Sequence, residues 1–166
     1  MVTQPAGMKL KLDVQQGIDE ASRATSADPK RARDTLQSDG FRGGWARTWL
    51  KDDEDVQVLV FELGDAFRAA DLATFQLKEL SKGRGVVGFP LVGVPRGTAY
   101  SFSGVTRAGS KQVFCQGGWF VVNRFALNVT DCAGAPRYPN LVQEVAGREY
   151  VLAAHATGTP VESASP

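Results

Sequence analysis

The apolar segment at 56–63, Val-Gln-Val-Leu-Val-Phe-Glu-Leu, constrains the fold more than any other part of the sequence. It is nearly continuous in apolar residues, and most of them are β-branched or aromatic, which is typical of a strand in the interior of a sheet. Gly64 ends this strand, and Asp65 follows as a suitable cap for a helix. The segment therefore predicts a central strand that leads directly into a helix packed on the sheet.

The helix predicted at 65–81 has one apolar stripe, whose members recur at intervals of three and four residues: Ala66, Ala69, Ala70, Ala73, Leu77 and Leu80. The polar residues outside the stripe are Arg68, Asp71, Gln76, Lys78 and Glu79. Such a division is typical of a helix with one side on a sheet and the other side in solvent. We expect the stripe of alanines and leucines to contact the sheet.

Turn and cap residues divide the rest of the chain into further elements. Asp28, Pro29 and Gly40 suit a helix cap, a first helical residue and a helix stop, and they predict a helix at 29–38. The segment 41–50 and the central strand are predicted to form a hairpin around a charged tip. Further strands are predicted at 86–94, 98–106, 111–116 and 119–129, with a turn at Gly117-Gly118, and a last helix at 140–156.

The opening of the chain is ambiguous, since 9–14 alternates like an edge strand whereas 15–24 has weak helical character. The order of the elements is that of an α+β fold with a mostly antiparallel sheet of about five to six strands and two to three packed helices. Short turns join most neighbouring strands, so at most one parallel pairing is expected. We predict a single domain at 8–156, a disordered N-terminal segment at 1–7 and a disordered tail at 157–166.

Residues suited to catalysis are scarce. The chain has one histidine, His155, so a Ser-His-Asp or Cys-His constellation would have to be completed from a frayed C-terminal end. We therefore predict a non-enzymatic protein without a metal or another cofactor. An enzyme that uses a carboxylate pair is an alternative, although no spacing singles out two of Glu62, Asp65 and Glu79. A formal net charge of +1 argues against a nucleic-acid partner.

The two cysteines, Cys115 and Cys132, enclose sixteen residues. Closing such a loop with a disulfide contributes roughly 3 kcal/mol to stability in the chain-entropy model. A straight strand after a turn at Gly117-Gly118 would carry Cys132 out of range, so the bridge requires the segment at 128–136 to bend back. We expect a disulfide in an outward-facing domain, and the alternative is two separate buried thiols.

The segment 86–94 is the place where a binding function could lie. It is apolar but is interrupted by two glycines and by Pro90, so it cannot run as an ordinary central strand. One interpretation is an irregular strand packed in the core. The other is an apolar lip beside the tryptophans, whose aromatic faces would line a cleft for a lipid, a glycan or a partner peptide. The candidate ligand-binding residues are Trp45, Trp49, Phe89, Leu91 and Trp119.

Several motifs of the chain are similar to those of a known group of domains. After the helix at 29–38 come Gly40-Phe-Arg-Gly-Gly-Trp45, the Val-x-Val-x-Val-Phe strand from Val56, the helix start Asp65-Ala-x-x-Ala-Ala70, and Val92-Gly-Val-Pro95. This pattern covers about residues 28–155 and resembles the extracytoplasmic α+β domains of actinobacterial lipoproteins and membrane-anchored sensor-like proteins. The resemblance implies a cell-surface or secreted location, near the membrane through an anchor that this sequence does not show.

The residues and the resemblance together favour a non-catalytic extracytoplasmic module that binds or senses a partner by surface recognition. The partner would be a protein, a glycan or an apolar ligand. A carrier is the alternative from another class, in which an apolar small molecule or a lipid lies between the helix at 65–81 and the sheet. A fully packed core would favour the first function, and a large apolar cavity would favour the second.

Overall fold

The computed structural model describes residues 4–26, 28–83, 85–105, 112–135 and 140–161. Residues 1–3 of the expected N-terminal segment and 162–166 of the expected tail lie outside the described residues. The elements follow one another as β1 (Lys9–Gln16), α1 (Ile18–Thr25), α2 (Pro29–Ser38), β2 (Gly43–Lys51), β3 (Glu54–Glu62), α3 (Ala66–Ser81), β4 (Val87–Pro90), β5 (Thr98–Val105), β6 (Gln112–Val122), β7 (Phe125–Ala133) and α4 (Asn140–Thr157).

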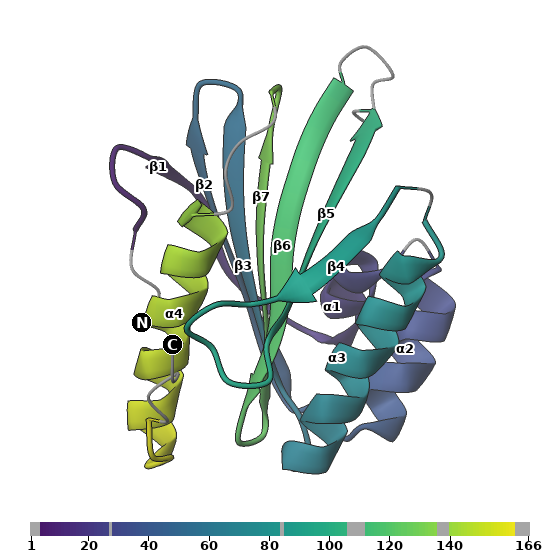
Figure 1. The fold of residues 1–166 in the computed structure, drawn as a ribbon. Helices are drawn as coiled ribbons and strands as arrows, with labels where there is room; N and C mark the ends of the chain where they lie inside the picture. The colour runs from purple at the N-terminus through teal and green to yellow at the C-terminus, as the bar shows by residue number, and fades with distance from the viewer. Residues whose placement is uncertain (1–3, 27, 84, 106–111, 136–139, 162–166) are drawn as a thin grey trace.

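The strands form one seven-stranded sheet with the order β1-β2-β3-β7-β6-β5-β4. All neighbouring strands are antiparallel. α4 covers one face of the sheet, and α1, α2 and α3 cover the other face (Figure 1). The α+β class and the antiparallel sheet are confirmed, whereas the expected numbers of strands and helices are too low. The ambiguous opening of the chain forms both an edge strand, β1, and a helix, α1.

Local signals account for the elements that were predicted best. Asp28 accepts a hydrogen bond from the backbone N–H of Arg31, and Pro29 begins α2, as expected for a cap followed by a first helical residue. Asp65 caps α3 in the same way and accepts from the N–H of Arg68 at 2.9 Å. The beginnings of these two helices are therefore fixed by residues that the sequence shows directly.

The sheet separates two hydrophobic cores. β3 contributes to both of them because its side chains alternate: Val56 and Val58 face α4, whereas Leu59 and Phe61 face the other three helices. All four side chains are at most 2% exposed. This burial on both faces explains why the segment is nearly continuous in apolar residues.

The Gly117-Gly118 pair lies inside a strand, and the predicted turn there is wrong. β6 runs without interruption through both glycines, and the chain reverses at Asn123, whose φ of +52° suits a tight turn. A Cβ atom on Gly117 would lie 2.4 Å from the hydroxyl of Tyr100, and one on Gly118 would lie 2.9 Å from Leu91 Cδ2. Tyr100 and Leu91 belong to the two different cores, so each glycine admits a side chain on one face.

Cys115 and Cys132 form a disulfide between β6 and β7. They lie directly opposite each other in the antiparallel pair, and their Cα atoms are 4.1 Å apart. The disulfide is confirmed, but the expected route to it is wrong. Because the hairpin reverses at Asn123, straight strands bring the two cysteines together and no bend at 128–136 is required.

Candidate functional site

A cleft with a volume of about 350 Å³ lies between α3 and the neighbouring ends of β5 and β6. α3 contributes the small side chains of its lining, which are those of Ala66, Ala70, Ala73 and Thr74. The remaining lining residues are Leu77, Arg96, Thr98, Trp119, Phe120, Val121 and Asn123. We call this hollow the α3 cleft. It lies where the carrier hypothesis placed a ligand, between the helix predicted at 65–81 and the sheet.

The orientation of α3 on the sheet differs from the sequence prediction, and it leaves small side chains beside the α3 cleft. The buried residues of this helix are Ala69, Leu72, Ala73 and Gln76. Ala66 and Ala70 are exposed, so part of the predicted stripe lies on the flank of the helix and not against the core. Alanine side chains are too short to fill the space above β5 and β6, and a cleft is left. The expectations that the whole stripe contacts the sheet and that Gln76 faces solvent are wrong.

Trp119 forms a fixed wall of the α3 cleft. It is 4% exposed, and its ring stacks on Phe61 with the two centroids 6.1 Å apart. Thr98 lies directly opposite Trp119 in the pair of β5 and β6, and it adds a hydroxyl to the same part of the lining. An aromatic ring that is fixed by packing and has a polar group nearby offers a ligand both a flat apolar surface and an orienting hydrogen bond.

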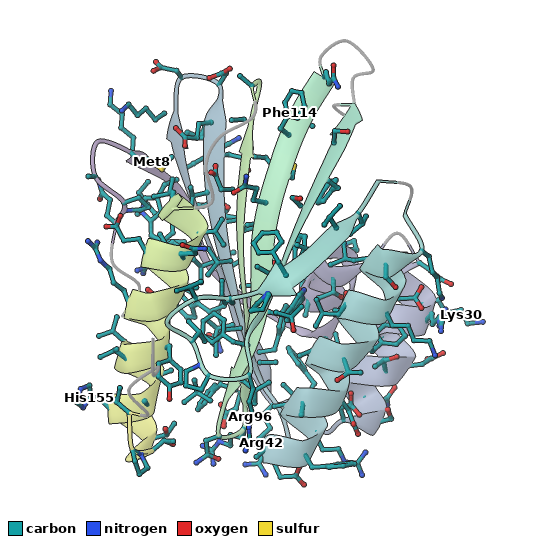
Figure 2. The ribbon with its side chains drawn as sticks, viewed as in Figure 1. Met8, Lys30, Arg42, Arg96, Phe114 and His155 are labelled. Atoms are coloured by element: carbon teal, nitrogen blue, oxygen red, sulfur yellow. A yellow bond between two sulfur atoms is a disulfide. The ribbon has the colours of Figure 1, made fainter. Side chains whose placement is uncertain are left out.

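Arg96 is the one charged side chain among the described residues that line the α3 cleft. It is the third residue of a turn that is closed by a hydrogen bond of 3.1 Å from the Gly97 N–H to the Val94 carbonyl. Pro95 in second place and a φ of +56° at Arg96 are the pattern of a type II turn, which normally has glycine in third place. The side chain is exposed and lies at the end of the molecule where β6 and β7 are joined (Figure 2).

The five ligand-binding candidates from the sequence do not line one cleft. Trp119 alone lies in the α3 cleft. Trp49 and Leu91 are at most 3% exposed and belong to the core under α4, and Phe89 packs against the same core. Trp45 is 40% exposed and lies on the same strand and the same face as Trp49. The structure therefore separates Trp119 from the other four by the thickness of the sheet.

A second hollow lies beside Trp45 on the face covered by α4. Two adjoining depressions of about 220 and 180 Å³ share Val60 and Phe125, and we call them together the α4 groove. The indole N–H of Trp45 donates a hydrogen bond of 2.6 Å to Asp13. Arg47 also donates to Asp13 and holds the pKa of that carboxyl below its usual range. The helical wall of the groove consists of Glu149, Leu152, Ala153, Ala156 and Thr157.

Charged side chains along the α4 groove already have partners. Glu62 pairs with Arg124 at 2.9 Å, and Arg42 donates to the carbonyl of Gly64. The groove is also more open to solvent than the α3 cleft. The α3 cleft is the less open of the two hollows and has an unused charge in its lining, so we take it as the candidate functional site.

The three carboxylates considered for catalysis have separate structural roles. Glu62 pairs with Arg124, Asp65 caps α3, and Glu79 accepts a hydrogen bond from Lys82 at 2.6 Å. The bond from Lys82 holds the pKa of Glu79 below its usual range. In the ranges that the structure describes, no three or more His, Cys, Asp or Glu side chains gather in a way that could hold a metal ion.

Comparison with known proteins finds a similarity in fold and no match in sequence. The sequence matches no protein-family model and no curated protein. The chain is similar in structure to the crystal structure of the extracellular domain of PknH from Mycobacterium tuberculosis, with a TM-score of 0.58 and 11% sequence identity. The similarity covers 89% of this chain and 86% of that chain. None of the helices described here is long and apolar enough to cross a membrane.

Sequence reasoning missed Arg96 and the cleft-lining role of the alanines. A signal for Arg96 was present, because Pro95-Arg-Gly97 is a turn sequence in which arginine stands where glycine or asparagine is usual. The alanines of α3 had no such signal. Small residues at helical spacing predict close packing as readily as a cleft, and the rotation of the helix decides between the two.

Proposed function

We propose that this chain is a non-catalytic binding module that works outside the cytoplasm and takes a small, largely apolar ligand in the α3 cleft. The observation that carries the proposal is a partly enclosed volume of about 350 Å³ with a fixed tryptophan wall. Ligand sites commonly have about 300–1,000 Å³ and an apolar lining with a few polar groups. In the α3 cleft, Thr74, Thr98 and Asn123 supply such polar groups.

Two features support a place outside the cytoplasm. The fold is similar to that of an extracellular domain, and a disulfide such as Cys115–Cys132 persists in oxidising compartments. We extend the proposal to a lipoprotein or membrane-anchored protein of the actinobacterial type that the motifs at 28–155 resemble. An anchor would keep the domain near the membrane, and occupation of the α3 cleft would be the event that the module senses or the means by which it retains its ligand.

A carrier of an apolar molecule is the second candidate, and the apolar part of the lining favours it. Leu77, Trp119 and Val121 would contact the carried molecule. The cleft is near the lower end of the usual range of about 300–1,000 Å³, so it suits one short chain or a small ring better than a lipid with two chains. A lipid that co-purifies with the native protein and appears in the mass spectrum of an organic extract would favour the carrier.

Titration with the neutral fluorescent probe N-phenyl-1-naphthylamine tests the proposed site. We expect one saturable site in the native protein, because an apolar probe gains free energy by leaving water. Ala70→Leu should abolish this binding by filling the cleft, without loss of stability, since Ala70 is exposed. Ala24→Leu, at an exposed position of α1, is the matched control and should bind the probe normally. Equal binding by Ala70→Leu and the parent protein would exclude the α3 cleft as the ligand site.

A further inference from the structure

Arg96 stands apart from the other arginines that the structure describes, because it forms neither an ion pair nor a side-chain hydrogen bond with the described residues. The others bind carboxylates or a backbone carbonyl, in the pairs Arg23–Glu20, Arg31–Glu79, Arg33–Asp19, Arg42–Gly64, Arg47–Asp13, Arg68–Asp39, Arg124–Glu62 and Arg148–Glu144. A guanidinium that its own protein leaves unused beside a cleft with both polar and apolar lining is available to a ligand.

The backbone conformation of Arg96 is a second, independent indication that this residue has a functional role. A φ of +56° is costly for an arginine and easy for glycine, so the residue at this place is not the one that the turn itself favours. The turn is held firmly, because Val94 is 4% exposed in the core and Gly97 donates to its carbonyl. Strain that a simple substitution would relieve is more readily explained by function than by folding.

We infer that the α3 cleft selects ligands with an anionic oxygen head group, a carboxylate or a phosphate, on a short apolar body, and that Arg96 binds the head group. This inference rests on the proposed function, because it names the ligand class of the same cleft. A guanidinium binds either head group through two parallel hydrogen bonds. Among the described residues no carboxylate lines the cleft, so an anion meets no like charge there. The apolar body lies against Trp119 and the alanines of α3.

Displacement of bound N-phenyl-1-naphthylamine by three ten-carbon ligands tests the selection. Decanoate, decyl phosphate and 1-decanol have the same apolar chain and differ in the head group, and all are used below the concentrations at which they aggregate. A charge-assisted hydrogen bond is stronger than a neutral one, so we expect both anions to bind roughly tenfold or more tightly than decanol. The two anions separate a fatty-acid preference from a phosphate preference.

Variants of Arg96 assign the selection to this residue. Arg96→Gly should bind decanol as the parent does but should lose the preference for the two anions. The same substitution should raise Tm by a few degrees, about what relief of backbone strain gives in a domain of this size. Arg96→Lys keeps the charge and should keep part of the preference. Arg42→Gln, which removes an exposed arginine from the same end of the molecule, is the matched control and should keep all of it (Figure 2).

The outcomes separate this inference from the proposed function. Equal affinities of the parent protein for decanoate, decyl phosphate and decanol would overturn anion selection and leave the α3 cleft as an apolar site. An anion preference that survives Arg96→Gly, or that Arg42→Gln removes as completely, would overturn the role of Arg96. If the probe and all three ligands fail to bind, both the inference and the proposed function are overturned.

Discussion

The two faces of the sheet are covered by helices with side chains of different length, and each face keeps a hollow where the covering helix presents alanines. α4 sends Val142, Val145 and Tyr150 onto its face, and each of them is at most 5% exposed. α3 places Ala66 and Ala70 beside the opposite face, and the α3 cleft lies next to them. Because α3 and α4 both contact β6 and β7, the position of a hollow follows from the covering helix more than from the sheet.

The two hollows also differ in whether their charged side chains have partners within the protein. In the α4 groove, Glu62 binds Arg124 and Arg42 donates to the carbonyl of Gly64, and nearby Arg47 binds Asp13, so each of these cations has a partner within the protein. In the α3 cleft, Arg96 has no such partner among the described residues. A paired charge contributes to structure, whereas an unpaired one beside apolar surface can contribute to recognition. The exposed tryptophan, Trp45, already donates its indole N–H to Asp13, whereas the guanidinium of Arg96 has no partner among the described residues.

The largest expected effect is the cost of removing the contact that holds α3 on the sheet. Leu72→Ala should lower the free energy of unfolding by about 2–5 kcal/mol, because Leu72 is fully buried and its loss leaves a cavity. Leu77→Ala should cost clearly less, because Leu77 lies at the cleft, where space already exists. Urea denaturation measures both. Equal losses would mean that the apolar stripe of α3 packs on the sheet as a whole and that the cleft is closed.

The disulfide gives the next effect, on the face that carries the α3 cleft. Cys115 lies four residues before Trp119 on β6, so both side chains point to the same face. Reduction, or the double substitution Cys115→Ala with Cys132→Ala, should lower stability by roughly 3 kcal/mol. Differential scanning calorimetry with and without reductant measures the change in Tm. Two free thiols in the unfolded, unreduced protein would show that the bridge is absent and that this face lacks its covalent support.

The paired glycines of β6 compare the packing of the two faces directly. Gly117→Ala should cost about 3 kcal/mol, at the upper end of what overpacking usually costs, because its Cβ would meet the Tyr100 ring at 2.4 Å and the Val129 carbonyl oxygen at 2.8 Å. Gly118→Ala should cost about 1 kcal/mol, because it meets the movable end of Leu91. Chemical denaturation of both variants ranks the two sites. The reverse order would mean that the core under α4 is the less adaptable one.

The comparison also shows how much of the fold the sequence could predict. The caps at Asp28 and Asp65 and the continuous apolar run of β3 act within a few residues, and each was predicted at its observed place. The strand through Gly117 and Gly118 was not predicted, because the reason for these glycines lies in Tyr100 and Leu91, which are remote in sequence. Local chemistry predicts where elements begin, whereas close approaches between elements do not appear in any short window.

The candidate site was predictable to a smaller extent. Trp119 was named, and the space between α3 and the sheet was given as a place for a ligand. Trp45, Trp49, Phe89 and Leu91 were grouped with Trp119 because all are large and apolar, yet the alternation of strands sends them to the other side. The rotation of α3 depends on how it packs against α2 and the sheet together, so its periodicity could not separate the core side from the cleft side.

The smallest expected effects concern two carboxyls on opposite faces, whose pKa values shift in opposite directions. The bond from Arg47 lowers the pKa of Asp13 on the α4 face, and burial raises that of Asp55, which alternation places on the other face with Leu59. Asp13 therefore stabilises the protein above its ordinary pKa of 3.8, and this stability is lost as the pH falls through the lower folded value. Asp55 binds its proton more readily in the folded state, so its contribution to stability increases as the pH falls from its raised folded pKa toward 3.8.

Asparagine substitutions make this opposition measurable. Asp13→Asn should be less stable than the parent at neutral pH, and the difference should vanish only below the ordinary carboxyl range, together with a change in Trp45 fluorescence as its hydrogen bond to Asp13 weakens. Asp55→Asn should be more stable than the parent at neutral pH, and that difference should vanish on acidification because protonated Asp55 resembles asparagine. Urea denaturation between about pH 7 and pH 3 measures both differences. The same sign for both variants at neutral pH would contradict the contrast between a carboxyl held by an ion pair on the α4 face and a buried one on the other face.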